Sequence, residues 1–192
     1  VKLPSDFKLL ALNQRSRDPD VKAALNYLHK RDVDEHDMWY FRIGTSNEPK
    51  WRRRVLFPSF DATGTLNFIV GRAVDARAKP KYQTPMVLRK TIVFNEINVD
   101  WKKQVVLCEG VFDALKCGEN AIPMLGSSLN ESSLLFERLV MNLTPVIVML
   151  DSDMIENSAP RLTRKLAEYK VDAKIVDIGS LGHKDPGSMS RD

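Results

Sequence analysis

Residues 104–118, QVVLCEGVFDALKCG, decide the fold. The unbroken apolar run Val105–Cys108 is typical of a strand that is buried on both faces of a parallel sheet. Glu109 and Gly110 end this run, and Val111–Gly118 then shows the apolar spacing of a short helix. A buried strand followed directly by a helix is the start of a βα unit, so we expect an α/β domain here.

The same alternation continues to the end of the chain. Further apolar strands are predicted at Ala121–Leu125, Val146–Leu150 and Ala173–Ile178. Helices are predicted at Glu131–Asn142 and Ala159–Tyr169. This element order predicts a four-stranded parallel sheet with right-handed crossovers and helices on both faces.

The first half of the chain has a different pattern. Asp18-Pro19 is a helix-start signal, and the helical spacing after it runs to about Arg31. Asp61–Gly64 predicts a hairpin turn, and Ala76–Lys90 predicts a loop with short elements. Strands are predicted at Trp39–Ile43, Arg54–Phe60 and Leu66–Arg72. We therefore expect a smaller α+β lobe over residues 1–103, followed by the α/β domain over 104–192.

Composition excludes several classes of protein. The chain has 192 residues, of which 43% are hydrophobic, enough for a folded core. It contains no apolar run of roughly 20 residues and no phosphate-binding or dinucleotide glycine motif. Cys108 and Cys117 are too few for a disulfide framework or a four-cysteine zinc site. We expect a cytoplasmic protein without a membrane partner (in the host cell if the source is viral), and a piece of a longer chain.

The charge is unevenly distributed. Residues 42–90 contain 11 Lys and Arg against three acidic residues, although the net charge of the chain is only +4. Aromatic residues and prolines lie between these cations: Trp51, Phe57, Pro58, Phe60, Pro80 and Tyr82. This pattern favours a nucleic-acid contact, and a solvated basic face is the equally acceptable alternative.

Acidic residues follow the predicted parallel strands. Glu109 and, four residues later, Asp113 follow the first strand, and Asp151 and Asp153 follow the third. Lys184 and Asp185 come after the fourth strand. Ligands of open parallel sheets bind at the carboxyl ends of the strands, and clustered carboxylates suit Mg²⁺ or Mn²⁺. The alternative for each acid is a helix cap, and Lys184 could contact a phosphate or pair with an acid.

These residues resemble a known family. The motifs of the Toprim domain, which bacterial-type primases, topoisomerases and certain nucleases share, are similar to three stretches of this chain. These stretches are Glu109-Gly110-Val111-Phe112-Asp113, Asp151-Ser152-Asp153 and Lys184-Asp185-Pro186. The lobe before them resembles that of bacterial and phage DNA primases, on the segments Arg54–Pro58, Asp61–Gly64, Val70–Arg72, Pro80–Tyr82 and Phe94-Asn95. The resemblance extends from about Leu28 to Pro186.

The resemblance implies roles for particular residues. Glu109, Asp151 and Asp153 would be catalytic. The metal ligands would be Glu109, Asp113, Asp151, Asp153 and Asp185. Nucleic acid or nucleotide would contact Arg54, Arg72, Lys81, Lys90 and Lys184. Trp51 or Tyr82 could stack a base, although core packing is the better expectation for both.

The chain also departs from the family pattern. Met154–Asn157 stand where a glycine usually follows the D-x-D motif, and Gly187 replaces a common acid. The zinc-binding and C-terminal parts of the family are not found in this stretch, which would therefore be the catalytic core alone.

The function implied is a metal-dependent primase, a DNA-directed RNA polymerase and thus a nucleotidyltransferase of DNA replication. It would synthesise short RNA primers from ribonucleoside triphosphates on single-stranded DNA, with Mg²⁺ or Mn²⁺ as cofactor and a replicative helicase as a further partner. Two alternatives remain open at this point: a non-catalytic nucleic-acid-binding Toprim module of a replication assembly, or a Toprim nuclease.

Overall fold

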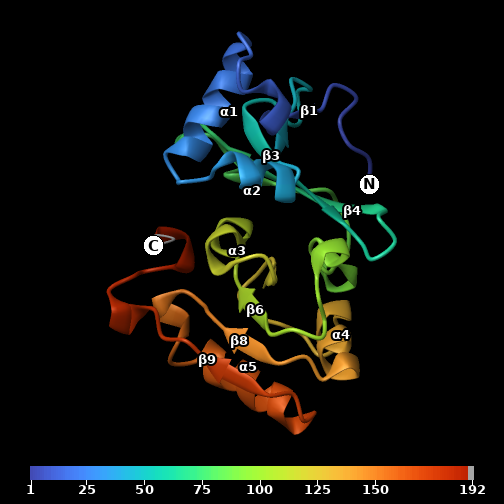
Figure 1. Ribbon diagram of the computed structural model, residues 1–192, viewed down its shortest axis with the longest axis vertical. Helices are drawn as coiled ribbons and strands as arrows, with labels where there is room; N and C mark the ends of the chain where they lie inside the picture. Colours follow the sequence, from blue (N-terminus) through green and yellow to red (C-terminus); the bar gives the residue numbers. More distant parts are fainter. Residues whose placement is uncertain (190–192) are drawn as a thin grey trace. The chain divides into compact units, whose positions relative to one another are not determined.

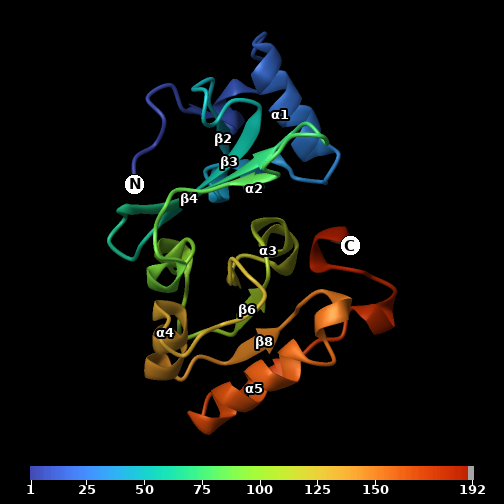
Figure 2. The same ribbon diagram turned by 180° about the vertical axis from the view of Figure 1, so that it is seen from behind.

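A computed structural model describes residues 1–189 of the chain. Contacts divide the chain into two compact units, Val1–Val87 and Leu88–Asp192. Figures 1 and 2 show the elements of both units from opposite sides. Over the described residues, no helix combines the length and the apolar character that crossing a membrane requires.

The first unit contains a five-stranded antiparallel sheet with the order β1-β2-β3-β4-β5. Its central hairpin confirms the predicted turn, where Asp61 Oδ1 accepts hydrogen bonds from the amides of Thr63 and Thr65. Gly64 adopts φ +82°, a left-handed conformation that glycine takes without strain. The strands are Lys8–Leu9 (β1), Gly44–Thr45 (β2), Arg54–Phe60 (β3), Leu66–Ala73 (β4) and Tyr82–Gln83 (β5).

The predicted first helix is confirmed as α1, Pro19–His29. The Asp18 side chain accepts a hydrogen bond from the Asp20 amide at 2.9 Å and so caps the helix start. The apolar face of α1 is fully or nearly fully buried: Val21, Ala24, Leu25 and Leu28. Burial of this face fixes the helix in the first unit.

The predicted strand at Trp39–Ile43 is wrong. The chain forms a short helix, α2, over Glu35–Tyr40 instead, and pairing with the sheet begins only at Gly44. Aromatic content favours a strand, but the Asp34 and Asp37 carboxylates each accept the other residue's amide in a capping box. These two local hydrogen bonds stabilise a helix start that a reading of the apolar residues misses.

The second unit confirms the predicted fold class. Its four strands are all parallel, in the order β7-β6-β8-β9. The strands are Val105–Cys108 (β6), Ala121–Pro123 (β7), Val146–Val148 (β8) and Ala173–Ile175 (β9). The helices are Val111–Cys117 (α3), Leu134–Asn142 (α4) and Ser158–Glu168 (α5). The short 3₁₀ helices of this unit are Arg89–Thr91 (η2), Glu96–Asn98 (η3), Ser152–Met154 (η4), Gly179–Leu181 (η5) and Pro186–Ser188 (η6), whereas Leu10–Asn13 (η1) belongs to the first unit.

Helices cover both faces of this parallel sheet, as the sequence predicts. Val105 and Leu107 of β6 lie in one apolar cluster with residues of α4 and α5. Val106 and Cys108, which alternate with them, pack instead with Ala114 of α3. In Figure 1, α3 and α5 accordingly lie on opposite sides of the strands. The solid apolar run of β6 is therefore explained by burial on both faces.

Residues 88–103 pack with the parallel sheet, although the sequence placed the lobe boundary at 103/104. Val93 is fully buried in the cluster formed with α4 and α5. Arg138 of α4 donates a hydrogen bond to Glu96 at 2.8 Å, and the Thr144 hydroxyl donates to the carbonyl of Trp101 at 2.7 Å. These contacts hold the segment before β6 against the second unit.

Candidate metal centre

The predicted acids follow the carboxyl ends of the central strands. Glu109 comes directly after β6, and Asp151 lies three residues beyond the end of β8. The amide of Ser152 donates a hydrogen bond to the carbonyl of Lys184 at 2.9 Å. This bond joins the loop after β8 to the loop that carries Asp185. Because β6, which Glu109 follows, pairs with β8, three motifs that are distant in the sequence meet at one edge of the sheet.

Asp113 connects two of these segments. Its Oδ2 accepts a hydrogen bond from the Gly110 amide at 2.9 Å, and its Oδ1 accepts one from the Gly187 amide at 3.1 Å. A Cβ atom at Gly187 would lie 2.9 Å from Asp113 Oδ1, so a larger residue would displace either the Asp113 carboxylate or the loop. The helix-capping alternative therefore holds for Asp113, which positions the 185–187 loop against α3.

Asp151 has the strongest electrostatic signature at this edge. Burial raises the pKa of its carboxyl from the usual 3.8 to about 7, with further contributions from the surrounding carboxylates. Those carboxylates belong to Glu109, Asp113, Asp185 and Asp153. The structure thus brings the other four acids singled out in the sequence within electrostatic reach of Asp151.

Glu109 has a carboxylate oxygen that no donor among residues 1–189 satisfies. Burial raises the pKa of its carboxyl, the amide of Asp151 counteracts this by donating a hydrogen bond, and the carboxylates of Asp113 and Asp153 raise it further. Its Oε1 is buried and has no hydrogen-bond partner among the described residues. A buried oxygen without a donor is costly, and a bound cation or a hydroxyl proton would remove that cost.

This donor set fits a hard divalent cation, because carboxylate oxygens are the ligands that Mg²⁺ and Mn²⁺ prefer. The acids do not form a compact ligand set, however. Among residues 1–189, one group of three potential ligands has its atoms within 4.8 Å of one another, and it consists of Asp34, His36 and Asp37 at the start of α2. The edge acids are thus neighbours that repel one another, and Asp113 is additionally held by two amides.

The predicted nucleic-acid contacts differ in their exposure. Lys81 in the first unit and Lys90 and Lys184 in the second are exposed, as a surface contact requires. Arg54 is only 8% exposed. Its Nη2 donates to the carbonyl of Pro80 at 2.9 Å and its Nη1 to that of Lys81 at 3.4 Å. The structure thus supports a structural role for Arg54, which fastens β3 to the 80–81 segment.

Arg72 belongs to an aromatic cluster. Its guanidinium donates a hydrogen bond to the Tyr82 hydroxyl at 2.6 Å and lies over the rings of Tyr82 and Tyr27. Tyr82 remains 44% exposed, whereas Trp51 is 5% exposed and packs in an apolar cluster with Leu56 and Ile69. Core packing therefore accounts for Trp51 but not for Tyr82.

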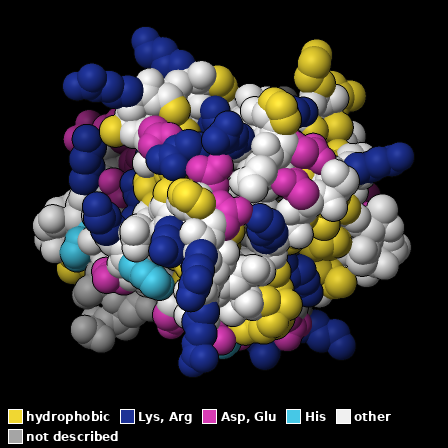
Figure 3. Space-filling model, turned by 90° about the horizontal axis from the view of Figure 1, so that it is seen from above, with side chains coloured by type: hydrophobic (Ala, Val, Ile, Leu, Met, Phe, Trp, Pro, Cys, Tyr) yellow, Lys and Arg dark blue, Asp and Glu magenta, His cyan; other side chains and the backbone are white. Residues whose placement is uncertain are grey.

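The basic excess of the first unit is partly neutralised within the unit. Arg53 donates to both carboxylate oxygens of Asp75 at 2.6 and 2.7 Å and also contacts Asp20, which pairs with Arg52 as well. On the face shown in Figure 3, Lys and Arg side chains are interspersed with Asp and Glu side chains. The charge count of the sequence therefore overstates the cationic surface that this unit offers.

The sequence did not predict two structural features near the carboxyl edge of the parallel sheet. Arg89 donates a hydrogen bond to the carbonyl of Leu125 at 2.9 Å and so fixes the loop after β7. A small pocket lies between that loop and α5, with Arg161 and Lys165 in its lining. Helical spacing places Arg161 and Lys165 on one face of α5, but it does not indicate which loop that face meets.

A parallel sheet with helices on both faces and acids at its carboxyl edge is the arrangement expected of a Toprim-type domain, here with an antiparallel lobe before it in the sequence. No family model matches the chain. A search of curated proteins finds a DNA primase of Campylobacter jejuni that is 30% identical over 149 residues, covering 71% of this chain. The chain spans about a quarter, 24%, of the length of that relative.

The solved structures show the same fold. A DnaG catalytic core covers 92% of this chain and 70% of its own, with a TM-score of 0.68 and 20% identity. The E. coli primase catalytic core covers 94% and 73%, with a TM-score of 0.66 and 19% identity. A DnaG primase catalytic domain bound to single-stranded DNA covers 83% and 62%, with a TM-score of 0.58 and 20% identity. These findings confirm the resemblance to bacterial-type DNA primase catalytic cores with a Toprim domain.

Proposed function

We propose that this chain is the catalytic core of a DNA primase, which joins ribonucleotides on a single-stranded DNA template. The observation that carries the proposal is the group of acids at the edge of the parallel sheet, where four carboxylates raise the pKa of Asp151 beyond the effect of burial. This group stands in a fold shared with primase catalytic cores, and a curated relative is named a DNA primase.

The residues divide into ligands and supports. Glu109, Asp151, Asp153 and Asp185 would hold Mg²⁺ or Mn²⁺, and Asp113 would keep the 185–187 loop in place through its bond to the Gly187 amide. A bound divalent ion would stabilise the negative charge that develops on the phosphates during the displacement. Glu109 Oε1 is buried without a hydrogen-bond donor in the part of the chain that the structure describes, so a bound cation would stabilise this atom most.

Binding of the template would depend on exposed cations. Lys81, Lys90 and Lys184 are exposed, and Arg72 presents its guanidinium together with the Tyr82 ring. Contacts between such side chains and phosphates release counterions, so template binding should weaken steeply as salt is added. A replicative helicase stays a predicted partner.

The test is a primer-synthesis assay with single-stranded DNA, labelled ribonucleotides and Mg²⁺ or Mn²⁺. Short oligoribonucleotides are expected from the chain and should disappear in Asp151→Asn. Asp172→Asn is the matched control, because Asp172 is an exposed acid directly before β9, at the opposite end of the sheet. Shortened DNA would indicate a nuclease instead, and salt-sensitive binding without any product would indicate a passive module.

A further inference from the structure

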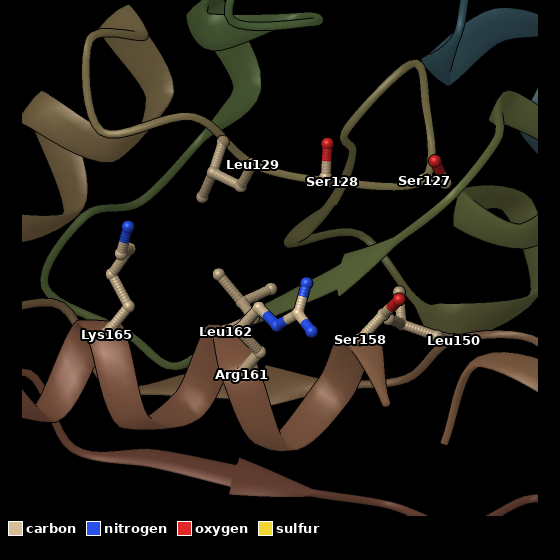
Figure 4. A pocket seen from close by; sticks show the side chains of 8 residues that line it. All are labelled: Ser127, Ser128, Leu129, Leu150, Ser158, Arg161, Leu162 and Lys165. Carbon is tan, nitrogen blue, oxygen red and sulfur yellow. The ribbon is translucent and has the colours of Figure 1, made fainter. Parts of the chain in front are cut away.

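None of the metal-centre acids lines the pocket beside α5. It lies between the loop after β7 and one face of α5, near the end of β8, and its volume is about 110 Å³ (Figure 4). Its lining residues are Ser127, Ser128, Leu129, Leu150, Ser158, Arg161, Leu162 and Lys165. The pocket lies wholly in the second unit, at the same edge of the sheet as the acids, because Leu150 directly precedes Asp151.

The polar groups of the pocket are suited to an anion. In Figure 4 the Arg161 guanidinium and the Lys165 ammonium extend from α5 toward the loop that carries Ser127 and Ser128. The Arg161 guanidinium has no ion-pair partner among residues 1–189. Lys165 pairs with Glu131 at 2.5 Å, which leaves one positive charge in excess over the three groups.

The apolar side and the size of the pocket limit which ligands it can bind. Leu129, Leu150 and Leu162 give one side of the pocket an apolar surface, and attraction between a cation and an anion is stronger beside such a surface than in bulk water. Pockets that enclose a whole small-molecule ligand measure roughly 300–1,000 Å³. A volume of about 110 Å³ therefore admits a group such as a phosphate or diphosphate, but not a complete nucleotide.

We propose that this pocket binds a phosphoryl oxyanion, with the Arg161 guanidinium as its principal ligand and the Ser158 hydroxyl as a further hydrogen-bond donor. A planar guanidinium can donate two parallel hydrogen bonds to phosphate oxygens. The oxyanion comes either from free pyrophosphate or from the polyphosphate tail of a nucleotide. Binding at this pocket does not depend on primer synthesis.

The test measures pyrophosphate binding by isothermal titration calorimetry in a metal-free buffer with EDTA. Under these conditions the acids at the strand ends repel an anion, so that they do not contribute to its binding. Arg161→Gln should weaken pyrophosphate binding about tenfold, the loss expected for one charged hydrogen-bonding group. Arg164→Gln is the matched control, because it removes the same charge from an exposed position of α5 that does not line the pocket.

Two results would overturn the proposal. One is equal weakening by Arg161→Gln and Arg164→Gln, which would mean that pyrophosphate senses only the general charge of α5. The other is an absence of measurable pyrophosphate binding to the unmodified chain at millimolar concentration. Circular dichroism of both variants should match that of the unmodified chain, because both side chains are exposed.

A competition arm distinguishes the two sources of the oxyanion. If ATP displaces pyrophosphate from the unmodified chain and Arg161→Gln weakens both ligands, the pocket accepts the tail of a nucleotide. If ATP does not displace pyrophosphate, the pocket is selective for the free anion. The outcome also separates this proposal from the function proposed above, since Arg161 can bind pyrophosphate in a chain that makes no primers.

Discussion

The basic segment of the first unit and the acidic edge of the second unit, formed by Glu109, Asp113, Asp151, Asp153 and Asp185, differ in how their charges are compensated. In the first unit, Arg53 is bonded to Asp75 and Asp20, and Arg54 is buried against backbone carbonyls. In the second unit, the charges that act most strongly on Asp151 are other carboxylates. Charges that pair with opposite charges stabilise a fold, whereas like charges held together oppose it. The acidic edge is therefore the part of the molecule whose arrangement calls for a ligand.

The largest effect is expected from changing Glu109, whose Oε1 has no hydrogen-bond donor among the residues described. Glu109→Gln should lower primer synthesis by about a hundredfold or more, because a divalent ion supplies several kcal/mol of stabilisation to the transition state. The comparison is Glu137→Gln, which changes an exposed acid on α4 and should leave the rate unaltered. A normal rate in Glu109→Gln would show that this oxygen has no part in the chemistry.

The next largest effect should come from removing the cation that pairs with the buried Glu96 carboxylate. Arg138→Met leaves the Glu96 carboxylate, whose side chain is 3% exposed, without its partner, and should lower the free energy of unfolding by about 2 kcal/mol. Lys103→Met breaks the exposed pair with Asp100 and should change it by less than about 0.5 kcal/mol. Urea denaturation of both variants measures the difference, and equal values would show that Glu96 is not held by Arg138.

Crowding the 185–187 loop should affect activity more than fold. Gly187→Ala places a methyl group 2.9 Å from Asp113 Oδ1 and should lower primer synthesis about tenfold, as for other supports of a metal site. Gly126→Ala serves as the control, since a Cβ there has no neighbour within 4 Å among the residues described. Equal activity of the two variants would contradict the positioning role of Asp113.

The contrast between free and paired cations can be tested through DNA binding. Lys81→Gln should weaken binding of single-stranded DNA about two- to threefold and reduce the slope of log affinity against log salt by about 0.7. Arg53→Gln should leave that slope unchanged, because Arg53 is already bonded to two acids. Fluorescence anisotropy at several salt concentrations measures both, and a reduced slope in Arg53→Gln would contradict the contrast.

A smaller effect concerns pH and the stability of the metal-free chain. The Asp151 carboxyl has a pKa of about 7 in the folded chain against the usual 3.8, so the folded state holds more protons between these values. Its contribution to stability therefore falls as the pH rises through that window. Asp151→Asn removes this loss of stability. Because water screens the partly exposed carboxylate, the effect is small, and Tm in EDTA should rise by roughly 2–4 °C at pH 8.

The gain in Tm should shrink as the pH falls toward 5, because the Asp151 carboxyl is then protonated in the folded chain. Differential scanning fluorimetry at both pH values measures the two gains. An identical gain at pH 5 and pH 8 would show that the Asp151 charge is not the source of the effect.

Patterns that depend on a single element were predicted well. The solid apolar run of β6 indicated burial on both faces, and the order of strands and helices fixed a parallel sheet. A parallel sheet in turn places the residues after its strands at one edge, which is why the sequence alone could predict that the acids lie together. The hairpin at Asp61–Gly64 followed from local turn chemistry in the same way.

Features that depend on distant partners could not be predicted. Arg54 belongs to a basic run, and only the 80–81 segment that folds over it makes it a buried residue. Asp113 matched a ligand motif, but its bond to the Gly187 amide spans 74 positions. The helix α2 is a different case, since Asp34 and Asp37 carry a capping signal that outweighed the aromatic residues.

The most direct test of the acidic edge as a metal centre is Mn²⁺ binding, followed by electron paramagnetic resonance without nucleotide or DNA. The chain should bind Mn²⁺, Asp151→Asn should bind it at least about tenfold more weakly, and Asp172→Asn should bind it as the unmodified chain does. Equal Mn²⁺ affinity in all three proteins would contradict the assignment of the edge acids as ligands.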